Sequence, residues 1–426
     1  MNKKLVIIGA ASNVFGVRAI QDIAIVPEME GAEVILVDIN EESLKLNYDL
    51  ARKLIEIKSR NVTLSYTTHR EEALPGADYV ILSVAVKRNE LWRPELYVPI
   101  KHGIKQTLGE NGGLGGLFHS LRSINVVAPI VRDIDRLCPD AILFNLTNPM
   151  SRVCMAISKM FKLRTIGLCH ELDNKLGQLA KLIDTPKEDI EATSAGINHI
   201  AFILDIRDRQ TGEDLYPRIK AALPRTGEGV MPLSNLFLDR MGHLCATDDR
   251  HMGEYVSFAR EYTDTLTEDY FTNNEAKWGR HAIYHREVAD GKQAPGPDLT
   301  GKSNERAIDI IAAIEGDTNA VESAVNIPNN GAISNFPDDA IVEVPGYLSR
   351  DGVKGKAIGE LPEQIAAFLR PQIDVHKMIT EAYIQKSKRL ALQAIMIDPA
   401  IPQFEAAEKA FEELLELQKD YLPELR

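Results

Sequence analysis

The first 170 residues alternate short, almost wholly apolar runs with longer stretches in which apolar residues recur every three or four positions. The short runs predict β-strands, and strands that helices cover on both faces have no polar side. The predicted strands are Lys4–Ile8, Glu33–Val37, Tyr79–Val84, Ala141–Leu146 and Arg164–Leu168. The stretches between them, such as Glu41–Ile57 and Gly116–Asp135, predict helices. This alternation predicts an α/β fold with a Rossmann-like, doubly wound parallel sheet.

The pattern changes after about residue 195. Ala201–Asp208 has the composition of a strand, and another β-type run lies near Ala340–Val344. A helical C-terminal region begins near Pro362, and its tail, Phe404–Leu425, is mostly an acidic amphipathic helix. A chain of 426 residues is too long for one typical core. We therefore expect a Rossmann-like domain over residues 1–195 and a second, mixed α/β domain over residues 196–426, which would carry ligand and oligomer contacts.

Charge and cysteine content narrow the class of protein. The formal net charge of -13 argues against broad binding to nucleic acid or to an anionic membrane. No stretch approaches the roughly 20 apolar residues that cross a bilayer. The cysteines are too sparse for a disulfide framework and fit reduced thiols; they are Cys138, Cys154, Cys169 and Cys245. We expect a cytoplasmic protein with a small-molecule partner.

A turn of small residues, Gly9–Gly16, follows the first strand and opens a helix. Such a turn lets the backbone approach a pyrophosphate, and the helix start offers free N–H groups. Asp38, at the end of the second strand, can accept ribose hydroxyls and favours NAD over NADP. The alternative is an ordinary strand-to-helix turn with Asp38 as a surface cap. The predicted cofactor contacts in the turn are Gly9, Ala11, Ser12, Asn13, Val14 and Phe15.

Two further segments predict ligand contacts near the sheet. Asn148 follows a strand at the expected carboxyl edge, and its amide can bind a sugar hydroxyl or the nicotinamide ribose. Its alternative is a turn in which it bonds only its own backbone. The glycine-rich loop Gly109–Gly116 precedes a helix with His119 and Arg122. So many glycines permit close ligand approach or a moving lid, or merely form a linker.

Cys169 and His199 are the candidate metal ligands. Both end β-like runs, and a thiolate with an imidazole suits zinc or another first-row divalent ion. A site with two protein ligands leaves positions for substrate oxygens. From spacing alone, a buried thiol and a hydrogen-bonded histidine are the commoner outcome. His170, beside the cysteine, can be a proton donor or a hydroxyl-binding group. The alternative is a hydrogen-bonded residue at the end of a strand.

A dense polar cluster runs from Asp248 to His251. One of its carboxylates, Asp248 or Asp249, can act as a general base, and Arg250 can bind an anionic substrate group through two hydrogen bonds. The alternative is a solvated acidic helix start, which the helix dipole also favours.

Together these segments resemble glycoside hydrolase family 4, the NAD- and manganese-dependent glycosidases, over nearly the whole chain. The resemblance implies NAD, a divalent metal (Mn²⁺) on Cys169 and His199, and a lactate/malate dehydrogenase-like architecture. The chain departs from the family pattern at Leu114, where proline is usual, and at Ala11, where glycine is usual. The segments that carry it are the first strand and turn, the glycine-rich loop with Leu121-Arg122, Asn148–Met150, Gly167–His170, Gly196–His199, Glu254-Tyr255 and Ile333–Pro345.

The family mechanism implies roles for these residues. NAD oxidises the sugar at carbon 3, a base removes the proton at carbon 2, the aglycone is eliminated, water adds and the hydride returns. Asp249 is the expected base, with Asp248 as its rival, and His170 is the expected acid or sugar-binding group. The further substrate contacts implied by the resemblance are Asn148, Arg250, Arg122 and Asn111.

The resemblance also bears on the sugar. Family members that act on phosphorylated sugars have aspartate after the cysteine, so His170 implies an unphosphorylated sugar. The run Asp249–His251 resembles the branch acting on uronic acids, in which the arginine pairs with a carboxylate. We therefore expect an α-galacturonidase-like enzyme. The alternatives are a neutral-sugar α-glucosidase or α-galactosidase, a hydroxy-acid dehydrogenase, and a non-catalytic nucleotide sensor. A homodimer or homotetramer is expected by analogy.

Overall fold

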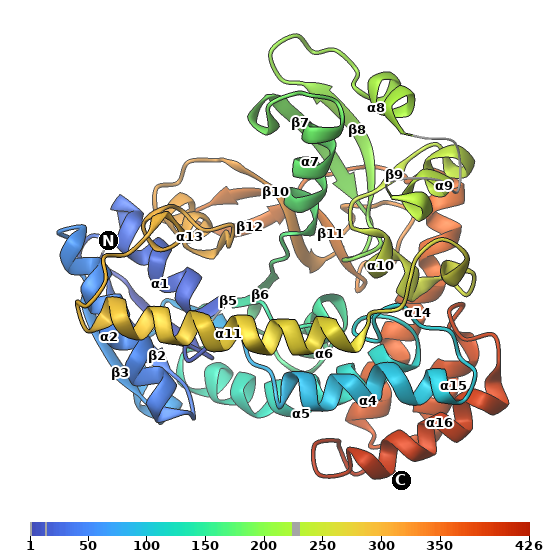
Figure 1. The fold of residues 1–426 in the computed structure, drawn as a ribbon, viewed down its shortest axis with the longest axis horizontal. Helices are drawn as coiled ribbons and strands as arrows, with labels where there is room; N and C mark the ends of the chain where they lie inside the picture. The colour runs from blue at the N-terminus through green and yellow to red at the C-terminus, as the bar shows by residue number, and fades with distance from the viewer. Residues whose placement is uncertain (1, 13–14, 224–230) are drawn as a thin grey trace.

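A computed structural model describes residues 2–12, 15–223 and 231–426. Its described part contains a nine-stranded sheet with the order β12-β11-β10-β6-β5-β4-β1-β2-β3 (Figure 1). The run from β3 to β6 is parallel throughout. It has the strand order of a dinucleotide-binding sheet, which confirms the predicted Rossmann-like fold. The parallel strands are β1 Lys4–Ile8, β2 Glu33–Val37, β3 Thr63–Thr67, β4 Tyr79–Leu82, β5 Ile142–Asn145 and β6 Arg164–Gly167.

Successive residues of β1 point into two different cores, one on each face of the sheet. Leu5 and Ile7 join the core that α1 and α2 cover. Val6 and Ile8 join the core that α5 and α6 cover. All four residues are at most 4% exposed. The helices of the parallel half are α1 Phe15–Ile25, α2 Glu41–Ile57, α3 Arg70–Ala73, α4 Arg88–Lys101, α5 Gly113–Leu137, α6 Met150–Met160 and α7 Glu171–Leu182.

Helix α5 is long and apolar enough to cross a membrane by length and composition. From the sequence we expected no apolar stretch long enough to cross a bilayer, and by length and composition α5 is an exception. In the structure 83% of the apolar window of α5 is buried inside the protein. Its apolar residues therefore serve the core beside the central sheet.

The central sheet continues into the second half of the chain. Strand β10 (Val321–Pro328) lies antiparallel beside β6, with Asn326 opposite Gly167. Strands β11 (Ile341–Ser349) and β12 (Gly352–Gly355) extend the sheet by antiparallel pairing. Residues from both predicted domains therefore share one sheet, and the division at residue 195 stays a prediction.

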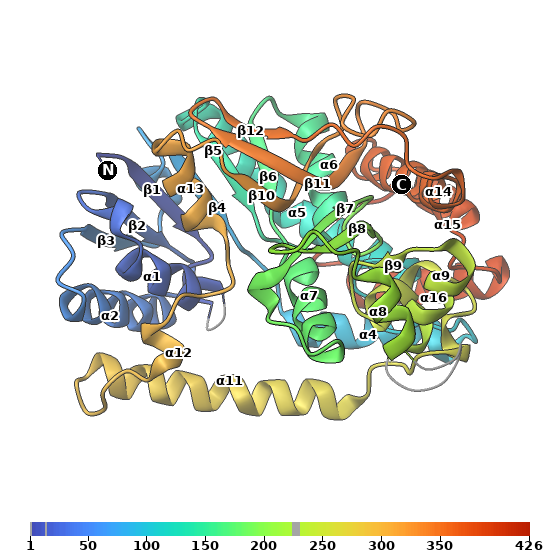
Figure 2. The ribbon, with the colours of Figure 1, turned by 90° about the horizontal axis from the view of Figure 1, so that it is seen from above.

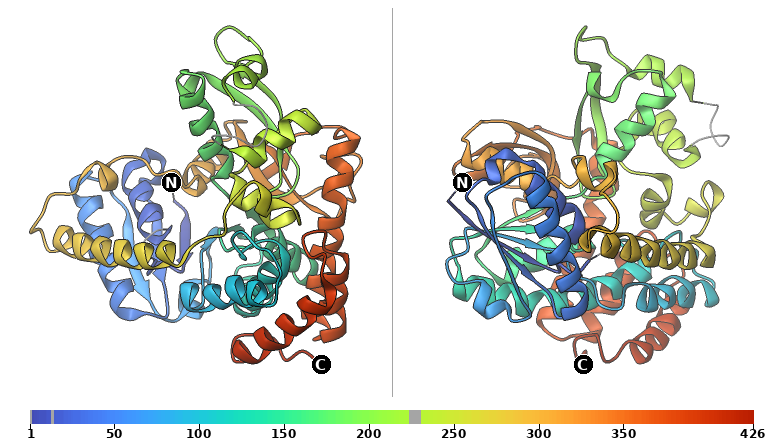
Figure 3. Two further views of the ribbon diagram at one scale, coloured as in Figure 1. Left: turned by 45° about the vertical axis from the view of Figure 1, so that its right-hand side comes forward. Right: turned by 60° about the vertical axis from the view of Figure 1, so that its left-hand side comes forward.

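A smaller antiparallel sheet, β7-β8-β9, has its own core and projects from the body of the molecule (Figures 1 and 3). Its strand β7 ends at Ala195, directly before the Gly196–His199 turn. Its elements are β7 Ile190–Ala195, β8 Phe202–Asp208, β9 Leu244–Cys245, α8 Tyr216–Ala222, α9 Pro232–Met241 and α10 Asp249–Met252.

Helix α11 (Glu268–Ala289) lies along one side of the molecule (Figure 2). The C-terminal helices pack on the core that α5 and α6 also cover, and the predicted helical tail is present as α16. The remaining helices are α12 Pro297–Thr300, α13 Ala307–Glu315, α14 Glu363–Ile384, α15 Lys388–Ile397 and α16 Phe404–Leu417.

Candidate active site

The turn after β1 is built for a close approach of backbone to backbone. Gly9 has a φ of +92°, and a Cβ at this position would lie 1.9 Å from the carbonyl oxygen of Ser83. Only glycine fits such a position without moving the chain. The N–H groups of Gly9 and Ala10 donate to Val37 at 2.9 and 3.1 Å. The turn is thereby fixed between β2 and β4.

A cavity of about 400 Å³ adjoins this turn. Gly9, Ala11, Ser12 and Asp38 line it, as does the Val84–Val86 segment after β4. The carboxylate of Asp38 accepts N–H groups from Ala11 and Asn40, each at 3.0 Å. Phe15 begins α1, whereas Asn13 and Val14 fall outside the described residues. A cavity with an acidic residue at its rim suits the ribose end of a dinucleotide.

Cys169 and His199 come together at the end of β6. The Sγ atom of Cys169 lies 3.4 Å from Nε2 of His199, across thirty positions of sequence. Two ligands of one tetrahedral zinc-like ion, with metal–S near 2.3 Å and metal–N near 2.1 Å, are separated by about 3.6 Å. The other ring nitrogen, Nδ1 of His199, is buried without a partner in the described part of the chain. The thiol and imidazole are therefore placed as a divalent metal requires.

The second half of the chain positions the histidine. Gly196 and Glu343 exchange backbone hydrogen bonds of 3.0 and 2.9 Å. Asn198 donates its side-chain N–H to the Glu343 carboxylate at 2.7 Å, and its side chain also forms a hydrogen bond with Cys169. At Gly196 a Cβ would meet Ala201 at 2.7 Å, so the turn needs glycine. Strand β11 thus holds the turn that presents His199.

Three more potential metal-binding side chains lie beside this pair. One ligand atom from each of Glu171, Asp248 and His251 falls within 4.8 Å of the others. The His251 ring centre is 4.4 Å from that of His199. Burial opposes charge on His251, but Asp248, whose Oδ2 is 2.9 Å from its Nδ1, and Glu171 raise its pKa to about 10. The same contact lowers the pKa of Asp248 against the effect of burial.

The structure separates the three neighbours in the Asp248–Arg250 run. Asp248 faces His251, and its side chain is 41% exposed. The Asp249 carboxylate instead accepts N–H groups from Leu233 and Ser234, at 2.7 and 2.9 Å, at the start of α9. Arg250 is exposed, and its carbonyl accepts a hydrogen bond from the hydroxyl of Thr107. Asp248 also caps α10, because its Oδ1 accepts the N–H groups of Arg250 and His251 at 2.8 and 3.1 Å. Both carboxylates therefore have a structural use, and Asp248 is the more exposed of the two.

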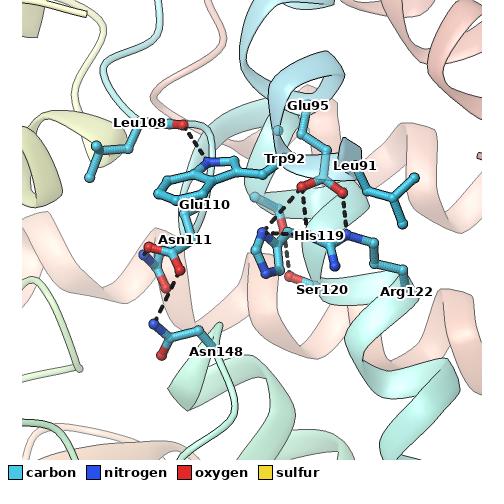
Figure 4. A network of polar contacts seen from close by, with 12 residues as sticks. Leu91, Trp92, Glu95, Leu108, Glu110, Asn111, His119, Ser120, Arg122 and Asn148 are labelled. Carbon is cyan, nitrogen blue, oxygen red and sulfur yellow. Dashed lines mark hydrogen bonds and ion pairs between the residues drawn. The ribbon is translucent and has the colours of Figure 1, made fainter. Parts of the chain in front are cut away.

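Glu110 of the glycine-rich loop, shown with Asn111 and Asn148 in Figure 4, forms a buried carboxylate pair with Glu254. Glu254 accepts backbone N–H groups of Glu110 and Asn111 at 2.6 and 2.7 Å, and the Asn111 side chain at 3.1 Å. Burial and the nearby Glu110 charge raise the pKa of Glu254 to about 7. Glu110 in turn accepts the side-chain N–H of Asn148 at 3.4 Å. The loop therefore links two predicted contacts, Asn111 and Asn148, through Glu110.

Arg122 lies in a buried ion pair (Figure 4). Its side chain is 1% exposed, and Nε is 2.5 Å from the Glu95 carboxylate, which is fully buried. His119 completes the group, with Nδ1 3.2 Å from Glu95. This placement does not support direct contact between Arg122 and a substrate, and indicates that the pair fixes α5 against α4.

His170 begins α7 beside the metal pair. It is half-buried, and its Nδ1 lies 3.8 Å from the Glu305 carboxylate, which also pairs with Arg18 at 2.8 Å. Sequence reasoning gave no role to Glu110, Glu171 or Glu343. Their only sequence signal was an acidic residue in or beside a motif, and their importance comes from contacts across the fold.

Two family models together match most of this chain. Residues 4–185 match the model described as "Family 4 glycosyl hydrolase". Residues 194–401 match "Family 4 glycosyl hydrolase C-terminal domain". The chain belongs to glycoside hydrolase family 4. It is an enzyme, a glycosidase, as the sequence resemblance implied.

Relatives in the family differ in substrate. An α-glucosidase of Erwinia rhapontici is 31% identical over the whole of both chains. An α-galacturonidase of Thermoanaerobacter italicus is 29% identical, covering 98% of this chain and 97% of its own. The crystal structure of a 6-phospho-α-glucosidase from gut microorganisms, in complex with NAD and Mn²⁺, has a TM-score of 0.87 at 22% identity and full coverage of both chains. This last likeness establishes the fold alone.

Proposed function

We propose that this glycosidase uses NAD and a divalent metal, Mn²⁺, to cleave α-linked glycosides of an unphosphorylated uronic acid. The observation that carries the proposal is the pair Cys169–His199, with sulfur and nitrogen 3.4 Å apart at the carboxyl end of β6. That edge of a doubly wound sheet is where ligands bind. The cavity beside the Gly9 turn lies on the same sheet, after β1 and β4.

The residues divide the work in the proposed mechanism. When bound, NAD supplies a hydride acceptor and the metal supplies Lewis-acid polarisation of the sugar oxygens. Cys169 and His199 hold the metal, while Asp38 and the Gly9 turn hold the dinucleotide. Asn148 orients a sugar hydroxyl or the nicotinamide ribose.

We assign the base to Asp248 in preference to Asp249. Asp248 is a member of the cluster with Glu171 and His251, and its side chain is 41% exposed, so its carboxylate can reach a substrate and take the proton at carbon 2. Asp249 stays the alternative; it is buried, and both of its oxygens accept hydrogen bonds from α9. His170, half-buried at the start of α7, donates a proton to the leaving oxygen or binds a hydroxyl.

Two observations favour a uronic acid. The run Asp249–His251 resembles the branch acting on uronic acids, and α-galacturonidases are among the relatives. His170, which follows the cysteine where phosphosugar enzymes have aspartate, favours an unphosphorylated sugar. A neutral α-glucoside is the second candidate, because the α-glucosidase relative matches over its full length.

The described cysteines are all free, which supports a reducing compartment, the cytoplasm.

The test assays reduced, metal-stripped protein on aryl α-galacturonide, α-glucuronide, α-glucoside and α-galactoside, with and without NAD and Mn²⁺. Aglycone release that needs both additions, with a preference for a uronide and no accumulating NADH, supports the proposal. A preference for a neutral glycoside would show that the substrate is a neutral sugar and not a uronic acid. Stoichiometric NADH from a hydroxy acid, without aglycone release, would refute the mechanism.

A further inference from the structure

Helix α11 is fixed at both ends. Near its start, Glu268 and Glu275 pair with Arg93 of α4 at 2.7 and 2.9 Å. Near its end it packs against α2, where Arg286 lies 3.8 Å from Glu42. Figure 2 shows the helix as a bar along the side of the molecule. The middle turns of α11 are therefore held between α2 and α4.

One arginine at this place has no acidic partner. Arg88 begins α4, two positions after Val86 of the dinucleotide-type cavity. Its guanidinium carbon lies 5.5 Å from the ring centre of Trp278, in the middle of α11. No carboxylate within the described ranges forms an ion pair with Arg88, whereas its neighbour Lys87 pairs with Glu90 at 2.8 Å. Stacking on an indole fixes a guanidinium but leaves its N–H edge free.

The guanidinium of Arg88 also lies near Glu110 of the glycine-rich loop. Arg88 acts electrostatically on Glu110, the carboxylate that accepts the Asn148 side chain. Although burial opposes ionisation of Glu110, His119 and Arg88 hold its pKa below the usual range, and His199 adds to the effect. Arg88 and His199 thus both lie within electrostatic reach of one buried carboxylate.

We propose that Arg88, held against Trp278, binds the carboxylate of an anionic sugar substrate. The inference rests on the proposed function and names the group that separates uronic acids from neutral sugars. A planar guanidinium offers two parallel N–H donors to a carboxylate, which a hydroxymethyl group cannot match. Both side chains are half-buried, so the pair is partly shielded from water and remains reachable.

The experiment compares galacturonate with galactose. Binding of each to the full-length protein loaded with NAD and Mn²⁺ is measured by calorimetry. The uronide-to-galactoside ratio of kcat/KM is measured alongside. Arg88→Gln should weaken galacturonate binding about tenfold more than galactose binding, the scale of one charge-assisted contact. Arg88→Lys should recover part of that loss, since it keeps the charge without the planar fork. Trp278→Leu should give an intermediate loss.

Lys87→Gln is the matched control, because Lys87 is the adjacent cation and its ammonium lies over the Tyr421 ring and pairs with Glu90. It should change the two sugars equally. Equal losses for both sugars in Arg88→Gln would overturn the inference, even in an enzyme that cleaves uronides. A selective loss confined to Arg250→Gln would overturn it and assign the carboxylate to Arg250.

The experiment distinguishes failure of the proposed glycosidase function from failure of the proposed role of Arg88. Arg88-dependent galacturonate binding without glycoside cleavage would refute the proposed function and support the inference. Uronide cleavage with unchanged sugar selectivity in Arg88→Gln would do the reverse. Circular dichroism and thermal unfolding of each variant verify that the fold is retained.

Discussion

Asn198 donates a 2.7 Å hydrogen bond to Glu343, a residue 145 positions away on β11. The same carboxylate accepts the Asn326 side chain at 3.1 Å. Its backbone pairs with Gly196. A residue in the second half of the chain therefore sets the orientation of the turn that carries His199, without contacting a metal itself.

This relationship predicts that Glu343→Gln lowers metal affinity. Asn198 and Asn326 both donate to Oε2 of Glu343, and a neutral amide oxygen accepts these two hydrogen bonds more weakly than a carboxylate oxygen. Outer partners of this kind are worth about 10- to 100-fold in affinity. Calorimetric Mn²⁺ titration should show that loss while NAD affinity stays within about twofold. Asp339→Asn, an exposed acid that pairs with Lys377, is the control. Unchanged Mn²⁺ affinity in Glu343→Gln would contradict the role.

Cys169→Ser should remove most metal affinity and most glycosidase activity while NAD binding persists. A serine hydroxyl is a poor ligand at neutral pH compared with a thiolate. Metal binding is measured by titration and NAD binding by quenching of protein fluorescence. Cys138→Ala, which removes a buried thiol elsewhere, should retain the metal. Activity at the wild-type level in Cys169→Ser would refute the ligand role.

Asp248→Asn and Asp249→Asn should fail in different ways. Loss of the general base at Asp248 should lower kcat about 100-fold or more, while the asparagine oxygen still caps α10 and limits the loss of stability. Asp249→Asn should cost about 1–2 kcal/mol in the free energy of unfolding, because one of the two oxygens that accept from Leu233 and Ser234 becomes an NH₂ group facing an N–H donor. Steady-state rates and urea unfolding separate the two effects. If Asp249→Asn instead lost its rate at unchanged stability, Asp249 would be the base.

Glu254 predicts a pH dependence of stability. Its pKa is about 7 in the folded protein against an ordinary 4.5. The folded state therefore binds the extra proton more tightly, and the stability from Glu254 is full below pH 4.5 and is lost as pH rises through 7. Urea unfolding at pH 5 and 8 should show a smaller decrease for Glu254→Gln than for wild type. Exposed Glu261→Gln should keep the wild-type slope, and an equal slope in both variants would contradict the assignment.

Strong local patterns were enough to predict part of the fold. Strands β1 and β2 and helix α2 begin and end where the sequence indicated, because their apolar runs are unbroken and Asn40 caps α2 by accepting from Ser43. Strand β3 was missed. It is an edge strand that alternates polar and apolar residues and is largely exposed. Its extended form depends on pairing with β2.

The limits of prediction at the site have the same physical origin. Cys169 and His199 sit in recognisable motifs, and the fold brings them together as expected. Arg122 also sits in a motif, but its partner Glu95 is 27 positions away and fully buried, so no local pattern reveals the ion pair. Glu343 meets the Gly196–His199 turn and Asn326 of β10, and Arg88 meets Trp278 of α11, so distant parts of the chain supply the surroundings of both residues.

The sheet that joins the two halves has a consequence for dissecting the enzyme. Residues 1–195 alone would leave β6 without its neighbour β10 and would offer unpaired N–H and C=O groups to other chains. Such an uncovered strand invites edge-to-edge aggregation. Residues 1–195 and residues 196–426 should therefore resist separate production, and the two fragments should recover activity only when they fold in each other's presence.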